Sequence, residues 1–123
     1  MPSIEADGVS VEFDWTDENR EVRDALADAA PFEGKARLWG DELYFDTPVD
    51  VVPEETTTDV DVGTVAYWQE GNALCVFWGP TPASVGDEPR PAEPVARVGH
   101  AEDAERLSSV EAGETARFAL TDD

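Results

Sequence analysis

Apolar and polar residues alternate near both ends of the chain, which is the pattern of a strand with one buried face. Near the start, single polar residues separate four apolar ones: Val9, Val11, Phe13 and Trp15. Near the end, residues 115–120 alternate again, and we expect Ala116, Phe118 and Leu120 to point inward. The pattern predicts a half-buried strand over residues 9–15 and another over residues 115–120.

Between these strands, one segment has the period of a helix. Its apolar positions share one face of a helix predicted over residues 18–30: Val22, Leu26 and either Ala29 or Ala30. Acids and arginines occupy the opposite face. Thr16 or Asp17 is the expected N-cap, and Pro31 is expected to end the helix.

Residues 36–45 predict a hairpin, with Gly40 and Asp41 as its two turn residues. This register puts four apolar residues on one face: Ala36, Leu38, Leu43 and Phe45. The other face carries Arg37, Trp39, Glu42 and Tyr44. One face of the hairpin is therefore expected in the core, and the other is aromatic and charged.

The most apolar part of the chain predicts two strands, residues 65–68 and 73–78, joined by a turn at 69–72. A further short strand is expected at 95–99 and a helical turn at 101–107. The acidic segment 47–61 is expected to be a loop with an edge segment, and the proline-rich segment 83–94 is expected to be irregular. One helix among six or more closely spaced strands predicts a mainly β fold, a closed or nearly closed barrel, as a single domain over residues 1–123.

The composition fits one ordinary domain, with 123 residues of which 41% are apolar, but the charge is extreme. Twenty-nine acids oppose eight basic residues, giving a net charge of -21. Such charge destabilises a compact chain by self-repulsion, and molar salt screens most of that repulsion. We therefore interpret the chain as halophilic; the alternative is an acidic protein that mimics DNA or binds a basic partner. Direct binding of nucleic acid is not expected, because it requires a basic patch.

The sequence also bears on location. It opens with no signal-like stretch, and no apolar run approaches the roughly 20 residues that a membrane-spanning helix needs. A cytoplasmic protein without membrane contact is the expectation.

No motif indicates a catalytic centre. Cys75 lies in an apolar strand and is expected in the core, and His100, next to several acids, is expected at the surface. One histidine and one cysteine cannot form a standard zinc site. Carboxylates could bind Mg²⁺ or Ca²⁺ anywhere along so acidic a chain, but none of them marks a site, and we predict no metal and no cofactor.

Four segments in order, residues 38–45, 63–68, 71–77 and 79–82, resemble the small prokaryotic (archaeal and bacterial) cyclophilin-like proteins of unknown function. The resemblance implies a cyclophilin-like closed β-barrel with one capping helix. Active cyclophilins isomerise X-Pro bonds with an arginine and a Phe-Met-x-Gln stretch. The only glutamine here is Gln69, and no Phe-x-x-Gln occurs. Prolyl isomerase activity therefore stays open, with no catalytic residue assigned.

Several residues are candidates for a ligand cleft, since apolar walls with a few polar groups are typical of such sites. They come from the hairpin face, the 69–72 turn and the proline-flanked loop: Arg37, Trp39, Glu42, Tyr44, Trp68, Asn72 and Thr81. Alternatively, the helix or the proline-rich loop simply covers the two rings of the hairpin face.

The leading prediction is a binding module for a peptide segment or small metabolite in an aromatic groove. The alternatives are a prolyl isomerase with a rewired groove, and a protein that pairs with a partner chain or with itself through Trp78 or Trp39. The expected state is a monomer or a homodimer.

Overall fold

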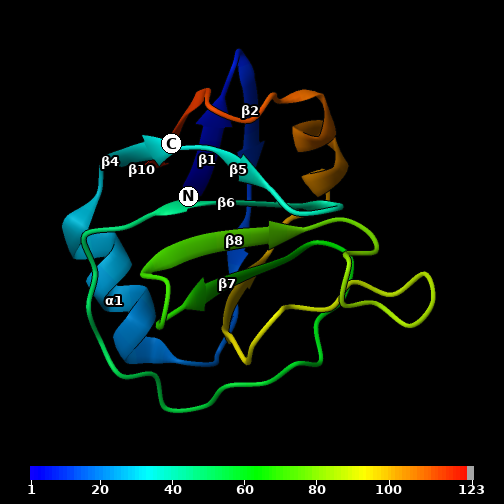
Figure 1. Cartoon of the computed structure of the whole chain (residues 1–123). Helices are drawn as coiled ribbons and strands as arrows, with labels where there is room; N and C mark the ends of the chain where they lie inside the picture. The colour runs from blue at the N-terminus through cyan, green and yellow to red at the C-terminus, as the bar shows by residue number, and fades with distance from the viewer. Residues whose placement is uncertain (122–123) are drawn as a thin grey trace.

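The computed structural model describes residues 1–121 and arranges them in two antiparallel sheets with one α-helix (Figure 1). The smaller sheet has the order β2 (Val9–Glu12), β1 (Pro2–Ala6), β10 (Thr115–Leu120), β4 (Phe32–Lys35). The larger has the order β3 (Asp14–Trp15), β9 (Ala96–His100), β7 (Thr64–Trp68), β8 (Ala73–Phe77), β6 (Glu42–Asp46), β5 (Arg37–Leu38). Helix α1 (Arg20–Ala29) and the 3₁₀ helix η1 (Ala104–Ser109) complete the fold.

The two sheets are joined at two corners. The chain passes from β2 to β3 at Phe13 and from β4 to β5 at Ala36, and both residues are buried. The mainly β prediction is confirmed. The ladders of residues 1–121 form two sheets and do not show the continuous closed barrel that the sequence predicts.

The main core lies between the sheets and is rich in phenylalanine. Phe118 contacts Phe13 and Phe32, with ring centroids 6.1 and 5.1 Å apart, and Phe32 contacts Phe45 at 6.1 Å. Val22 and Leu26 of α1 are fully buried against this core. The amphipathic helix prediction is therefore confirmed.

A second, smaller apolar cluster lies on the opposite face of the larger sheet. Along β8, Leu74 and Val76 belong to the main core, whereas Cys75 and Phe77 belong to the second cluster. The alternation follows from the pleat, which sends successive side chains to opposite faces. Val95, at the end of the proline-rich loop, packs in the second cluster and brings that loop over the sheet.

The helix begins later than predicted. Neither Thr16 nor Asp17 caps it; the residue before its first turn is Asn19, with a left-handed φ of 51°. Asparagine tolerates this conformation better than most residues. Its side chain binds distant segments instead of the helix, donating to the Arg97 carbonyl at 3.1 Å and accepting from the Glu55 amide at 2.9 Å.

Two strands were not predicted, and one predicted strand is divided. β1 and β4 have weak alternation and pair with β10 on its two sides, so long-range pairing creates them. The predicted strand 9–15 is interrupted at the Phe13 corner.

Two residues predicted to point inward are exposed. Leu38 is 38% exposed because β5 is a two-residue edge strand, and Leu120 is 44% exposed because it ends β10.

The remaining strand, turn and loop predictions between residues 64 and 100 are confirmed, and His100 is exposed as expected. Within residues 1–121, no helix combines the length and apolar character needed to cross a membrane.

Candidate functional site

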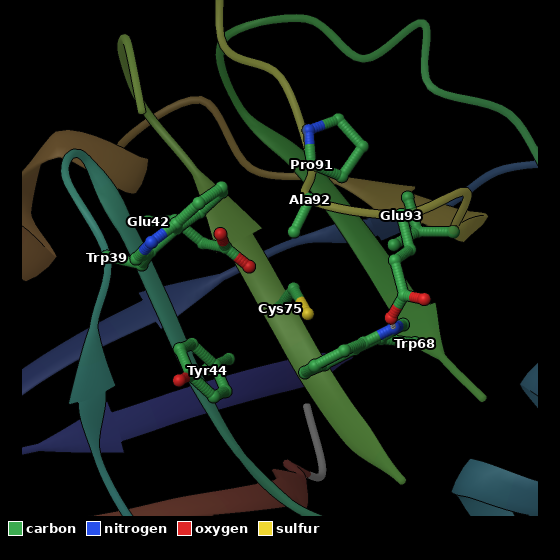
Figure 2. A pocket seen from close by; sticks show the side chains of 9 residues that line it. Trp39, Glu42, Tyr44, Trp68, Cys75, Pro91, Ala92 and Glu93 are labelled. Carbon is green, nitrogen blue, oxygen red and sulfur yellow. Dashed lines mark hydrogen bonds between the residues drawn. The ribbon is translucent and has the colours of Figure 1, made fainter. Parts of the chain in front are cut away.

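A cavity of about 210 Å³ opens on the face of the larger sheet that carries the second cluster (Figure 2). The β5–β6 hairpin supplies Trp39, Glu42 and Tyr44 to its lining, β7 supplies Trp68 and β8 supplies Cys75. The remaining wall comes from the segment 91–95, at the end of the proline-rich loop.

Strand pairing explains why a hollow forms here. Tyr44 lies opposite Cys75 across the β6–β8 ladder, and Ala66 lies opposite Cys75 across the β7–β8 ladder. Cys75 and Ala66 carry small side chains at the centre of the sheet, while large rings stand around them at Trp39, Tyr44 and Trp68. The sheet therefore presents a low floor between tall aromatic walls.

The aromatic walls are set at defined angles. The rings of Tyr44 and Trp68 lie edge to face, with centroids 6.1 Å apart and planes at 81°. Figure 2 shows Trp39 and Trp68 on opposite sides of the Glu42 carboxyl group. The Trp68 indole N–H donates to Oε1 of Glu93 at 3.0 Å and so ties β7 to the loop wall.

Glu42 is the unusual residue of the cavity. It is only 6% exposed, and its carboxyl group points into the hollow (Figure 2). Burial raises its pKa to about 7, and a hydrogen bond with the Cys75 thiol lowers the pKa in part. At neutral pH this carboxyl group is therefore close to half protonated.

Cys75 lies beside it at the floor. Burial raises the pKa of the thiol well above its ordinary value, and the neighbouring charge of Glu42 raises it further. The thiol is therefore protonated at neutral pH and is a poor nucleophile, since reactivity requires the thiolate.

The loop wall is held by the hairpin turn. The Asp41 N–H donates to the Pro80 carbonyl at 2.9 Å, and the Trp78 N–H donates to the Asp41 carbonyl at 2.9 Å. Thr81, which is buried, donates to the Arg90 carbonyl and accepts from the Ala83 amide. These bonds fix the loop just before it reaches the cavity.

Of the seven residues predicted to form a cleft, four meet in the cavity: Trp39, Glu42, Tyr44 and Trp68. Three do not line it. Arg37 is exposed, paired with Asp46 at 3.2 Å and placed 5.7 Å above the Tyr44 ring. Asn72 takes a left-handed φ of 47° and donates to the Val49 carbonyl at 2.8 Å, which is a structural role in its turn. Thr81 lies outside the lining and holds the loop in place through its hydrogen bonds with the Arg90 carbonyl and the Ala83 amide.

Five lining residues lie outside the sequence-based candidates: Cys75, Pro91, Ala92, Glu93 and Val95. Cys75 was assigned to the core; it is buried as predicted, but at the floor of the cavity. Its alternation with Leu74 and Val76 carried a usable signal, because it puts Cys75 on the hairpin's aromatic face. The loop residues carried no such signal in the sequence, because an irregular segment has no periodicity. In the part of the chain that the structure describes, no three or more His, Cys, Asp or Glu side chains gather as a metal site.

The comparisons with known proteins agree with this architecture. The family model described as cyclophilin-like matches residues 3–119, nearly the whole chain. The chain belongs to the cyclophilin-like family. This cyclophilin-like protein is also similar to a hypothetical protein from Archaeoglobus fulgidus whose solution structure is known. The two are 34% identical with a TM-score of 0.82, and the match covers 98% of this chain and 93% of that one. No functionally curated protein matches the sequence.

Proposed function

We propose that this cyclophilin-like protein is a binding module that holds a small molecule or a peptide segment in the cavity around Glu42. The observation that carries the proposal is a carboxyl group, 6% exposed, that faces an aromatic hollow and has no cationic partner among the residues lining it. Buried carboxyl groups that serve only the fold are usually ion-paired or bonded to backbone amides, since burial without a partner costs stability. An apolar pocket with one polar group of raised pKa is the usual make-up of a ligand site.

The size of the cavity limits the ligand. Its volume of about 210 Å³ lies below the range of about 300 to 1,000 Å³ that holds drug-sized molecules. It suits a small metabolite or one side chain of a peptide. The rings of Trp39, Tyr44 and Trp68 are half-buried, so they offer contact area without being sealed in.

Binding can be tested by ligand-observed NMR with a library of small fragments, in molar KCl. We expect Trp39→Ala and Tyr44→Ala each to weaken the affinity of the hits at least about tenfold, the equivalent of roughly 1.4 kcal/mol. Leu38→Ala is the matched control, because Leu38 neighbours Trp39 in the chain and lies outside the cavity lining. Unchanged affinity in both aromatic variants would exclude this cavity as the binding site.

The lining supports binding better than prolyl isomerisation. Active cyclophilins use an arginine, whereas the described lining offers two carboxyl groups, three aromatic rings and no guanidinium. We expect no acceleration in a protease-coupled proline isomerisation assay run in molar salt. A rate above the uncatalysed one would restore the isomerase alternative.

We also propose that the acid-rich composition adapts the chain to a salt-rich cytoplasm. Within residues 1–121 the structure pairs acids with arginines at four places, against 29 acids in the whole chain. Most acids are therefore left to solvent and counterions, which is where salt acts on stability.

A further inference from the structure

We propose that the occupant of the cavity is an organic cation, an alkylated ammonium group, held between the rings of Trp39, Tyr44 and Trp68 and against the Glu42 carboxyl group. This inference rests on the proposed binding function and names the chemistry of its ligand.

The arrangement of rings is the first reason. Tyr44 and Trp68 stand at 81° to each other and form two adjoining walls, and Trp39 stands across from Trp68 (Figure 2). The faces of aromatic rings carry negative potential and attract a cation within about 6 Å, tryptophan most strongly. The guanidinium carbon of Arg37 lies 5.7 Å from the centroid of the Tyr44 ring, so this ring already contacts one cation.

The charges of the lining are the second reason. Glu42 lies inside the cavity and Glu93 at its wall, and neither lysine nor arginine is among the lining residues. An anion would meet two carboxyl groups. A neutral ligand would leave an ionised Glu42 without a cationic partner, whereas a cation would pair with it.

Size and hydration select the kind of cation. The cavity volume of about 210 Å³ is that of roughly seven water molecules in the liquid, at ~30 Å³ each. A cavity of this size suits a compact head group. An alkylated ammonium spreads its charge over apolar methyl groups that the rings can cover. Quaternary ammonium groups are the ligands that aromatic cages typically recognise.

The titration of Glu42 links binding to protons. The titratable groups that line the cavity with it are Cys75 from β8, Tyr44 from its own strand and Glu93 from the loop wall. The pKa of Glu42 is about 7 in the free protein, and a bound cation favours the ionised form. Binding therefore releases a proton, and affinity rises with pH. A neutral ligand that accepts a hydrogen bond from the protonated carboxyl group would show the opposite trend.

The test compares choline with its neutral isostere, 3,3-dimethylbutan-1-ol, by calorimetric titration at fixed molar KCl. At pH 8 we expect choline to bind at least about tenfold more tightly than the isostere. Between pH 6 and pH 8 its affinity should rise close to tenfold, because the ionised fraction of Glu42 rises from about a tenth to about nine tenths. The isostere should show no such rise.

Glu42→Gln keeps the shape of the side chain and removes its charge. In this variant choline should lose its pH dependence and the part of its advantage over the isostere that the carboxylate supplies, and it should keep the smaller part that the rings supply. The affinity of the isostere should be retained. Leu38→Ala, outside the lining, should bind both ligands like the wild type. A peptide with trimethyllysine, compared with the same peptide carrying plain lysine, shows whether the ammonium group arrives free or on a chain.

The outcomes separate the two proposals. Equal affinity for choline and the isostere overturns the cation inference and leaves the cavity as a binding site. The cation inference is also overturned if fragments bind in the cavity but neither choline nor the trimethyllysine peptide binds. If fragments, choline and peptide all fail to bind, both proposals are wrong.

Discussion

At the scale of single residues, Glu42 distinguishes this chain from a plain packed sheet. Alternation along β6 sends Leu43 and Phe45 into the main core and leaves Glu42 and Tyr44 on the opposite face. The sequence alone is enough to place Glu42 on that face. Its burial depends on the segment 91–95, which arrives from a distant part of the chain, so the raised pKa had no local signal.

Replacing Glu42 with glutamine should stabilise the fold in a pH-dependent way. The pKa is about 7 in the folded protein and near 4.5 when unfolded, so stability is lost as pH rises from about 4.5 to 7. The gain in the free energy of unfolding from Glu42→Gln should therefore be larger at pH 8 than at pH 5.5, by about 2 kcal/mol. Denaturant titrations in molar KCl measure this difference.

Glu111→Gln, at an exposed position, is the control: it measures how far the loss of one negative charge alone changes the free energy of unfolding. An equal gain from Glu42→Gln at both pH values would mean that Glu42 is not held in an apolar environment.

At the scale of elements, the cavity depends on the contact between the hairpin turn and the loop that follows β8. Gly40 has a φ of 62°, and a Cβ atom there would lie 2.7 Å from the Cα of Thr81 and 2.9 Å from the Pro80 carbonyl oxygen. The turn thus needs glycine for its own conformation and for its close approach to the loop.

Gly40→Ala should therefore be more damaging than the same change at Gly8. Gly8 also has a positive φ, 77°, but nothing lies within 4 Å of an added Cβ. We expect Gly8→Ala to cost about 1 kcal/mol of backbone strain, and Gly40→Ala to cost at least about 1 kcal/mol more. Thermal unfolding of the two variants measures this, and equal costs would contradict a tight turn–loop contact.

The elements that were predictable are those whose signal is local. The hairpin, the β7–β8 pair and the amphipathic face of α1 follow from alternation, turn residues and helical period. β1 and β4 acquire their structure by pairing with β10, and the docking of the loop on Gly40 joins residues forty apart. The same division holds for the site: Trp39 of the hairpin turn and the strand residues Tyr44 and Trp68 were predictable, while Pro91 and Glu93 were not.

At the scale of the whole molecule, a small two-sheet fold carries a net charge of -21. The aromatic core and the second cluster hold it together, while acids distributed along the whole chain oppose compaction. The balance between these contributions must depend on ionic strength, because salt screens charge repulsion between exposed groups.

The melting temperature should rise on the order of tens of degrees between dilute buffer and molar KCl, because salt removes most of the self-repulsion. Circular dichroism at a series of KCl concentrations follows it. A non-ionic osmolyte at matched osmolality is the control and should raise the melting temperature much less. A melting temperature that does not change with salt would contradict the halophilic interpretation.

The four tryptophans provide the most direct test of the cavity as a ligand site. Trp39 and Trp68 line it, whereas Trp15 and Trp78 pack against the main core. In a ¹H–¹⁵N NMR titration with fragments that bind, the indole signals of Trp39 and Trp68 should shift while those of Trp15 and Trp78 stay in place. Shifts confined to Trp15 and Trp78, or binding that moves no indole signal, would contradict the account.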